Sequence, residues 1–217
     1  MPLCGRYACG SAEIAVWKIE ETIEQLSSLV DSATFVESEK FASVERRSEW
    51  LAVRALLRLL LGGDARVVYD EAGKPSLEGG RVFMSVSHTR GYAAVALSQD
   101  FPLGLDVELA DREVGIASRR FMREEELDGV APHLHNDAKL IRWTVSEALF
   151  KLVGDLGGNF RENIVIDGLC PERYGLFALS VDGVSRGNGR YWAAYLFDAP
   201  LLVTVCGIER LAALRAV

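Results

Sequence analysis

FPLGLDVEL, residues 101–109, is an apolar run that carries two carboxylates, Asp106 and Glu108. Such a run is typical of a buried strand. Burying an unpaired carboxylate is very costly unless the group is protonated, paired with a basic side chain or bound to a cation. The central question that this sequence raises is therefore which partner neutralises these two acids.

On a strand, residues two apart share one face, so the carboxylates of Asp106 and Glu108 repel each other. A divalent cation between them would remove that repulsion, and all-oxygen ligands favour Mg²⁺, Mn²⁺ or Ca²⁺ over zinc. The alternative is a strand end where both side chains reach water or pair with arginine. A D-x-E motif by itself does not decide between the two interpretations.

The composition is that of a soluble globular protein. The chain has 217 residues, of which 49% are hydrophobic and 25% are charged. That length allows one large domain or two of about 100 residues each. There are 24 basic and 31 acidic residues, and the resulting net charge of −7 argues against a nucleic-acid partner. A net negative charge is still compatible with a local basic pocket.

The sequence also predicts no membrane partner. Its longest apolar run is broken by Arg58 and is too short to cross a bilayer. The first residues lack the basic-then-apolar order of a secretory signal. The four cysteines form no C-x-x-C pair, which argues against zinc and favours free thiols. We therefore expect a cytoplasmic protein.

The hydrophobic pattern predicts an α+β fold. Strong helical periodicity covers residues 38–62 and 137–153, with Gly62 and Gly63 ending the first helix and Gly154, Gly157 and Gly158 ending the second. Weaker helices are predicted at 20–29 and 113–127. Strands are predicted at 11–17, 67–70, 82–86, 92–97, 103–109, 164–166, 174–181, 191–197 and 201–206.

A similarity within the chain hints at two related halves. Residues 91–107 and 190–206 both read as a strand, a short turn and a second strand. Two apolar hairpins in any α+β protein would also look alike, so this similarity is a hint only. No linker separates the two stretches, and we expect the halves to pack closely.

Two short motifs carry groups suited to chemistry. In WTVSEALFK, residues 143–151, Glu147 and Lys151 are neighbours on one helix face, although such a pair is also an ordinary surface ion pair. In SVSHT, residues 85–89, Ser87 and His88 end a predicted strand, where they would face an anion or simply form a turn. A serine nucleophile is unfavourable here because adjacent side chains on a strand point apart.

Basic residues precede these motifs. Arg46, Arg47, Arg54 and Arg58 lie on the helix predicted at 38–62, and Lys74 follows in a Gly-Lys-Pro turn. Arginines on an amphipathic helix usually form a solvated face. Followed by this turn and by the Ser-His pair, they suggest a phosphate-rich ligand.

Six motifs occur in the order RRSEWLAVRALLR, GKP, SVSHT, PLGLDVE, RRFMREEE and RWTVSEALFKLVG. Over roughly residues 38–160, this order resembles the 4′-phosphopantetheinyl transferase superfamily, in particular its larger, Sfp-type class. The resemblance implies transfer of the phosphopantetheine arm of coenzyme A to a serine of an acyl or peptidyl carrier protein, with release of 3′,5′-ADP. It also implies two similar α+β halves, residues 1–101 and 102–217, with the active site between them.

The resemblance implies a role for each matching residue. It makes Asp106, Glu108 and Glu147 ligands of Mg²⁺, with Mn²⁺ as a substitute. Glu147 would be the base for the carrier serine, and Lys151 and His88 would stabilise or protonate the departing 3′,5′-ADP. The coenzyme A contacts would be Arg46, Arg54, Gly73, Lys74, Pro75, Ser87 and His88.

One position departs from the family's pattern. The family often has lysine immediately before the helix glutamate, where this chain has Ser146. A positive charge near the phosphates is then missing, and Arg142 or Arg123 is the candidate to supply it. Glu126 matches an acidic position of the family whose role is less clear.

Other properties stay open at the level of sequence. Arg119, Arg120 and Arg123 are candidates for docking an acidic carrier protein, and ordinary solvated arginines are an equal alternative. Two fused halves favour a monomer. The alternatives to an active transferase are a coenzyme A-binding homologue with weak or no transfer activity, and a non-catalytic α+β interaction module.

Overall fold

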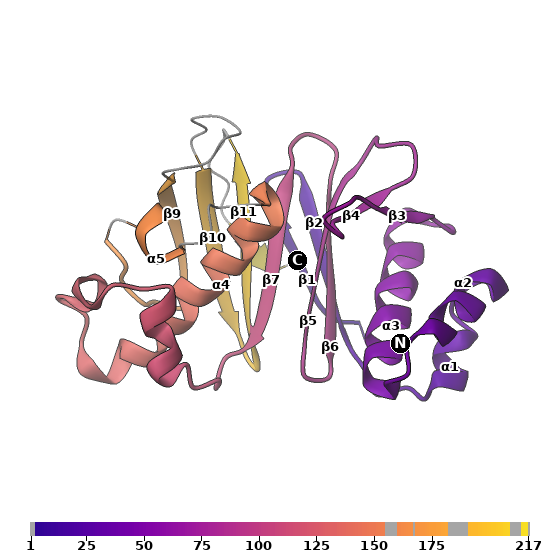
Figure 1. Cartoon of the computed structure of the whole chain (residues 1–217), viewed down its shortest axis with the longest axis horizontal. Helices are drawn as coiled ribbons and strands as arrows, with labels where there is room; N and C mark the ends of the chain where they lie inside the picture. The colour runs from indigo at the N-terminus through magenta and orange to yellow at the C-terminus, as the bar shows by residue number, and fades with distance from the viewer. Residues whose placement is uncertain (1–2, 155–159, 167, 182–190, 209–213, 217) are drawn as a thin grey trace.

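Two sheets lie between two long helices in the computed structural model of the chain (Figure 1). The structure describes residues 3–154, 160–166, 168–181, 191–208 and 214–216. Helix α3 (Val44–Leu61) covers the outer face of one sheet, and helix α4 (His135–Val153) covers the outer face of the other. The layers are therefore helix, sheet, sheet and helix, and the predicted α+β class is confirmed.

In the described part of the chain, each sheet has five antiparallel strands. The first has the order β12-β1-β2-β6-β5, and the second has the order β7-β11-β10-β9-β8. A separate hairpin joins β3 (Val67–Tyr69) to β4 (Pro75–Leu77). The strands of the first sheet are β1 (Leu3–Cys9), β2 (Ala12–Lys18), β5 (Phe83–Thr89), β6 (Tyr92–Ser98) and β12 (Leu214–Ala216). Those of the second are β7 (Leu103–Leu109), β8 (Ile164–Ile166), β9 (Tyr174–Val181), β10 (Tyr191–Asp198) and β11 (Leu201–Ile208).

The two sheets repeat one arrangement. In the first half, β2 is followed by α3 and then by β5 and β6, and β6 pairs with both β2 and β5. In the second half, β7 is followed by α4 and then by β10 and β11, and β11 pairs with both β7 and β10. This shared order confirms two similar α+β halves. The short strand β12 crosses back and pairs with β1.

The sequence similarity between residues 91–107 and 190–206 does not reflect this repeat. The second stretch forms the hairpin β10–β11 inside one sheet. The first contains β6 and β7, which belong to different sheets and mark the passage between the halves. The two stretches look alike because each is a pair of buried apolar strands joined by a short turn containing proline. The chain does have two similar halves, but the sequence similarity between these two stretches does not come from that repeat.

Three apolar cores hold the layers together. The middle core lies between the sheets and takes one face of β7, including Leu103, Leu105 and Val107. The outer cores lie under α3 and under α4. Because alternate residues of β7 enter the middle core, the intervening Gly104, Asp106 and Glu108 face α4.

Local sequence sets the ends of α3. The Ser43 hydroxyl accepts a hydrogen bond from the Arg46 backbone N–H, and Gly62 ends the helix with a positive φ of 69°. The helix predicted from residue 38 thus begins only at Val44. Residues 38–40 form a short 3-10 helix, and Phe41 is extended. The remaining short helices are α1 (Ile23–Ser27), α2 (Ser32–Glu37) and α5 (Phe160–Asn163).

Three other predicted elements differ from the structure. The helix predicted at 113–127 is two 3-10 helices, Gly115–Arg120 and Glu124–Leu127. Ser87 and His88 lie inside β5 rather than beyond its end. Gly157 and Gly158, expected to end α4, lie outside the described residues. No helix in the described part of the chain is long and apolar enough to cross a membrane.

Gly104 lets α4 lie directly on the backbone of β7. A Cβ atom built on Gly104 would stand 1.9 Å from the carbonyl oxygen of Ala148 and 2.9 Å from the backbone nitrogen of Leu152. Neither backbone atom can move without moving the helix. The glycine therefore fixes the spacing of the strand that carries Asp106 from the helix that carries Lys151.

Gly104→Ala is expected to lower the free energy of unfolding by about 3 kcal/mol, because the methyl group must push α4 away from β7. Urea denaturation measures this loss. Gly63→Ala is the matched control, since nothing lies within 4 Å of a Cβ atom at Gly63. Equal stability of the two variants would contradict the close approach of α4.

Candidate active site

The two halves meet where the edge strand β5 lies beside the edge strand β7 (Figure 1). Serine side chains of β5 join them. The Ser85 hydroxyl accepts the backbone N–H of Leu105 at 2.9 Å, and the Ser87 hydroxyl accepts that of Val107 at 3.1 Å. Sequence reasoning missed Ser85, although the alternation of Ser85, Ser87 and Thr89 along β5 was a readable signal.

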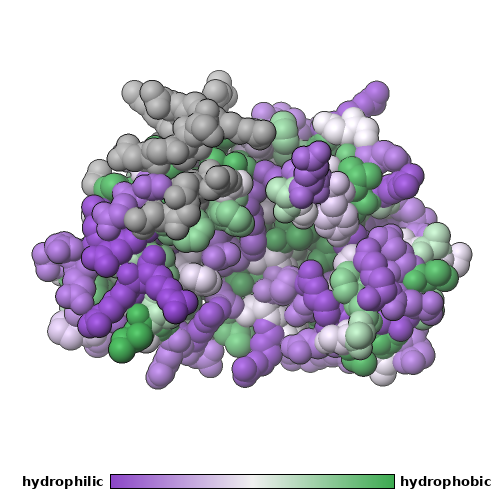
Figure 2. All heavy atoms as spheres, in the orientation of Figure 1, coloured by the Kyte–Doolittle hydropathy of each residue, from purple (hydrophilic) through white to green (hydrophobic). Residues whose placement is uncertain are grey.

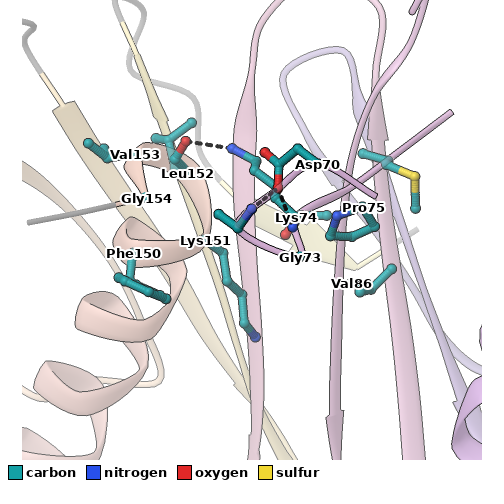
Figure 3. A pocket seen from close by; sticks show the side chains of 13 residues that line it. Asp70, Gly73, Lys74, Pro75, Val86, Phe150, Lys151, Leu152, Val153 and Gly154 are labelled. Atoms are coloured by element: carbon teal, nitrogen blue, oxygen red, sulfur yellow. Dashed lines mark hydrogen bonds between the residues drawn. The ribbon is translucent and has the colours of Figure 1, made fainter. Parts of the chain in front are cut away.

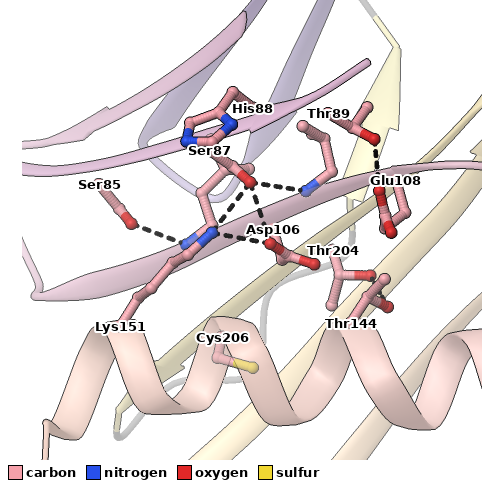
Figure 4. A network of polar contacts seen from close by, with 12 residues as sticks. Ser85, Ser87, His88, Thr89, Asp106, Glu108, Thr144, Lys151, Thr204 and Cys206 are labelled. Carbon is pink, nitrogen blue, oxygen red and sulfur yellow. Dashed lines mark hydrogen bonds and ion pairs between the residues drawn. The ribbon is translucent and has the colours of Figure 1, made fainter. Parts of the chain in front are cut away.

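Asp106 lies at this junction and is 6% exposed. Its Oδ1 accepts hydrogen bonds from Lys151 Nζ at 2.7 Å and from the Ser87 hydroxyl at 2.9 Å (Figure 4). Lys151 Nζ also lies 2.9 Å from the Ser87 hydroxyl. Three residues predicted from separate motifs are thus brought together by β5, β7 and α4.

Glu108 is neutralised by a different cation. It is 5% exposed, and the Thr89 hydroxyl donates a hydrogen bond to its Oε1. Arg112, in the loop that follows β7, forms an ion pair with Glu108. The Arg112 guanidinium also lies 5.7 Å from the ring centre of Trp143 on α4. Sequence reasoning missed Arg112; its place four residues after Glu108 was the only signal.

Both buried acids therefore have a basic partner from the chain itself. Lys151 holds Asp106, and Arg112 holds Glu108. Within the described ranges, no group of three or more His, Cys, Asp or Glu side chains is placed to hold a metal ion. The expected ion pair between Glu147 and Lys151 is not among the ion pairs of the described residues, because Lys151 turns to Asp106.

Glu147 faces the same cluster from α4. Burial, followed by the negative charge of Asp106, raises the pKa of the Glu147 carboxyl, while Lys151 and Arg112 oppose the rise. Trp143, Glu147 and Lys151 follow one another at intervals of four residues and so share one helix face. The donor chemistry fits a hard cation, since Asp106, Glu108 and Glu147 supply only carboxylate oxygens.

A second cluster lies on the α3 side of β5. Glu49 accepts from Arg46 at 3.1 Å and lies 3.4 Å from Nδ1 of His88, whose Nε2 is 2.6 Å from Arg46 Nη1. Burial lowers the pKa of His88, and Arg46 and Lys151 lower it further against the opposing effects of Glu49 and Asp106. The imidazole is therefore mainly neutral at pH 7. Sequence reasoning missed Glu49, an acid on the buried face of α3.

The predicted basic residue Arg54 has other contacts. Its guanidinium lies 3.8 Å from the ring centre of Trp50, and its Nη2 donates to the Tyr69 hydroxyl at 2.8 Å. Tyr69 belongs to β3, so Arg54 joins α3 to the hairpin that carries the Gly-Lys-Pro turn. Arg46 and Arg54 therefore contact different parts of the first half.

A pocket of about 490 Å³ opens between the Gly-Lys-Pro turn, β5 and the C-terminal end of α4 (Figure 3). Gly73, Lys74, Pro75 and Lys151 are the predicted site residues among those that line it. Lys74 Nζ donates to the Leu152 carbonyl oxygen at 2.7 Å and thereby joins the two halves across the pocket. Lys151 belongs both to the pocket and to the cluster around Asp106.

The turn that forms one wall of this pocket is shaped by Asp70. Its Oδ1 accepts the backbone N–H groups of Ala72 at 3.0 Å and Lys74 at 2.8 Å. Gly73 has a φ of 80°, a conformation that favours glycine. The Gly-Lys-Pro motif is thus a tight turn whose backbone faces the pocket.

Arg142 does not supply a charge to this site. It is completely buried beneath the second sheet, where it forms an ion pair with Glu126 at 2.9 Å and contacts the Ser146 hydroxyl. Its Nη2 donates to the carbonyl oxygens of Phe160 and Ile164. Ser146, where the family often has lysine, therefore points into the second half. Arg123 also turns to Glu126, at 3.8 Å.

The predicted docking arginines lie on the surface. Arg119 is exposed and lies 3.6 Å from Glu124, and Arg120 is also exposed. The face seen in Figure 2 is mostly hydrophilic, with hydrophobic residues in small separate patches. A carrier-docking role for these arginines stays a prediction.

Curated proteins similar to this chain were found. The chain is 30% identical to the 4′-phosphopantetheinyl transferase HetI of Nostoc sp. (strain PCC 7120) over 168 residues, which cover 67% of this chain and 70% of HetI. It is 31% identical to the 4′-phosphopantetheinyl transferase AcpT of Escherichia coli K12 over 115 residues, or 50% of this chain and 59% of AcpT. No family model matches the chain. The identity with HetI, over more than two thirds of that protein, shows that the chain belongs to the 4′-phosphopantetheinyl transferases.

Proposed function

We propose that this protein transfers the 4′-phosphopantetheine group of coenzyme A to a serine of an acyl or peptidyl carrier protein and releases 3′,5′-ADP. The observation that carries the proposal is the position of Lys151. Its ammonium group contacts Asp106 and Ser87, and the same side chain lines the pocket between the halves. A phosphate-rich ligand in that pocket would place its charge beside the acidic cluster.

Coenzyme A would bind across the junction. The pocket has the size of a site for a small ligand and is lined by two lysines, Lys74 and Lys151. Arg46 and His88 lie together on the neighbouring face of β5, where they would meet further phosphate groups. Because His88 is neutral at pH 7, the positive charge of that cluster comes from Arg46.

In the reaction, the carrier serine oxygen forms a bond to the β-phosphorus of coenzyme A, and the bond between that phosphorus and the bridging oxygen breaks. Glu147 would accept the serine proton. Lys151 would stabilise the negative charge on the departing 3′,5′-ADP. Positioning and charge neutralisation dominate such displacements.

Asp106, Glu108 and Glu147 would hold a Mg²⁺ or Mn²⁺ ion, which when bound would offset the negative charge of the diphosphate. Their all-carboxylate chemistry supports this assignment. So does the closeness of Asp106 to Glu147, because burial and then the negative charge of Asp106 raise the pKa of Glu147. The assignment of the three residues to one ion is a proposal about the complex with coenzyme A.

Lys74→Ala is expected to raise the KM for coenzyme A by about tenfold, because one charged hydrogen bond at the pocket is worth roughly 1.5 kcal/mol. The loss combines weaker phosphate binding with release of the α4 end from the turn. Steady-state kinetics with varied coenzyme A measure it, with Lys139→Ala, a substitution on α4 away from the pocket lining, as the control. An unchanged KM would remove Lys74 from the binding site.

The direct test is mass spectrometry of apo carrier proteins incubated with this protein, coenzyme A and Mg²⁺. Addition of the phosphopantetheine arm to the carrier serine is the expected result. Binding of coenzyme A without modification of any carrier would favour the homologue that lacks transfer activity. A thermal shift that does not respond to coenzyme A and Mg²⁺ would favour the interaction module, because a ligand in excess stabilises any protein that binds it.

A further inference from the structure

The acidic cluster of β7 already contains its own cations. Asp106 and Glu108 are both buried, and each is held by one basic side chain, Lys151 or Arg112. Three carboxylates and two basic groups leave a net charge of about −1 when Glu147 is ionised. A divalent cation binds more weakly to a site of lower net negative charge.

Arg112 differs from the rest of the cluster in its exposure and in its place on a loop. Its side chain is 49% exposed, whereas that of its partner Glu108 is 7% exposed. It comes from the loop after β7 rather than from a strand or a long helix. Its contact with the Trp143 ring, at 5.7 Å, places it on the helix face that also carries Glu147 and Lys151.

We propose that Arg112 is an internal counter-ion of Glu108 that keeps the affinity of the acidic cluster for a divalent cation low until an anionic ligand attracts the guanidinium away. In the free protein, Arg112 and Lys151 neutralise the two acids of β7. When a diphosphate enters beside Lys151, both basic groups turn to it, and the carboxylates become available to a metal ion. This inference rests on the proposed function, because it takes coenzyme A as the anionic ligand.

The proposal depends on the positive charge of Arg112, so removing that charge should change the affinity of the acidic cluster for a metal ion. A unit charge about 5 Å from a divalent ion changes the binding affinity by about tenfold, even when the interaction is screened as in water. Arg112→Gln should therefore tighten metal binding by about tenfold in the absence of coenzyme A. Arg112→Lys, which keeps the charge, should stay close to the wild-type affinity.

The experiment is a Mn²⁺ titration of the free protein followed by the electron paramagnetic resonance of unbound Mn²⁺, with and without coenzyme A. The proteins are wild type, Arg112→Gln, Arg112→Lys and the control Arg119→Gln, which removes an exposed arginine from the neighbouring 3-10 helix. Without coenzyme A, we expect only Arg112→Gln to bind Mn²⁺ more tightly than wild type does. Adding coenzyme A should then tighten Mn²⁺ binding less in this variant than in wild type.

Two outcomes would overturn the inference in different ways. If Arg112→Gln binds Mn²⁺ as weakly as wild type while coenzyme A still tightens binding in both, Arg112 is no counter-ion and the proposed function stands. If none of the proteins binds Mn²⁺ even with coenzyme A, both the counter-ion role and the metal assignment are wrong. Carrier modification, followed separately by mass spectrometry, then decides whether the transfer itself occurs.

Discussion

Asp106→Ala is expected to lower kcat/KM for transfer at least about a thousandfold, because this carboxylate serves three groups of the proposed site. It holds the Lys151 ammonium at 2.7 Å and the Ser87 hydroxyl at 2.9 Å, and it is a proposed metal ligand. Removing it would free Lys151 from its position beside the pocket. The loss is therefore expected mainly in kcat rather than in the KM for coenzyme A.

The fold should survive this change. Lys151 is 27% exposed, so its ammonium group can reach water when its partner is lost. The free energy of unfolding should then fall by only about 1–3 kcal/mol, the range for a hydrogen bond to a charged group. Thermal denaturation measured in parallel with transfer separates lost chemistry from lost structure.

Asp111→Ala is the matched control for Asp106→Ala. Asp111 is an exposed acid in the loop immediately after β7, so its removal changes the net charge equally without touching the buried cluster. We expect near wild-type transfer from this control. Wild-type turnover by Asp106→Ala itself would show that the chemistry does not depend on this carboxylate.

The fold was predictable where the hydrophobic pattern was strong and local. Strand β7 begins and ends as predicted, and α4 does so within two residues, because long apolar stripes and runs dominate those segments. Strand β1 was missed because only Tyr7 and Cys9 of it are buried and because it includes Gly5 and Arg6, so it contains no clear apolar pattern. The two 3-10 helices after β7 were misread as one helix. Val114, Ser118, Phe121 and Met122 are buried at helical spacing across this segment, although it is not one continuous helix.

The site residues that were predictable from the sequence are those that lie within short contiguous motifs. Ser87, Asp106 and Lys151 come from three predicted motifs and lie together because each motif is on a regular element. Glu49 was not predicted because its partner His88 lies on an element far away in the sequence. Arg112 was not predicted because it lies in a loop, where no periodic pattern indicates its contact with Glu108. No pattern within α3 reveals that Glu49 faces a histidine of β5 across the helix–sheet interface.

Ser146, immediately before Glu147, is another residue whose surroundings the sequence does not predict. Sequence alone presents Ser146 as the loss of a cation from the phosphate site. The structure places this side chain in the interior, with its hydroxyl against the guanidinium of Arg142. Arg142 stands one helical turn earlier, and its Nη1 donates to that hydroxyl. Arg142 is therefore a buried cation that neutralises Glu126 in this chain.

Arg142→Ala should consequently be among the most destabilising substitutions in this protein. It removes a completely buried guanidinium from the Glu126 carboxylate, whose side chain is 6% exposed. Glu126 keeps the backbone N–H of Arg123 at 2.8 Å, but the guanidinium of Arg123 lies 3.8 Å away. The substitution also leaves the carbonyl oxygens of Phe160 and Ile164 without this donor. Breaking a buried ion pair from one side costs roughly 3–5 kcal/mol, which corresponds to a fall in Tm of about 10 °C or more.

Ser146→Lys on its own should also destabilise the protein, because it places a second cation beside Arg142 where Glu126 offers one carboxylate. Combined with Arg142→Ala, the same lysine should recover about half of the lost stability, since its ammonium group then takes the place of the guanidinium. A double-mutant cycle by urea denaturation measures this coupling. Additive losses in the double variant would show that the new lysine cannot replace Arg142 as the partner of Glu126.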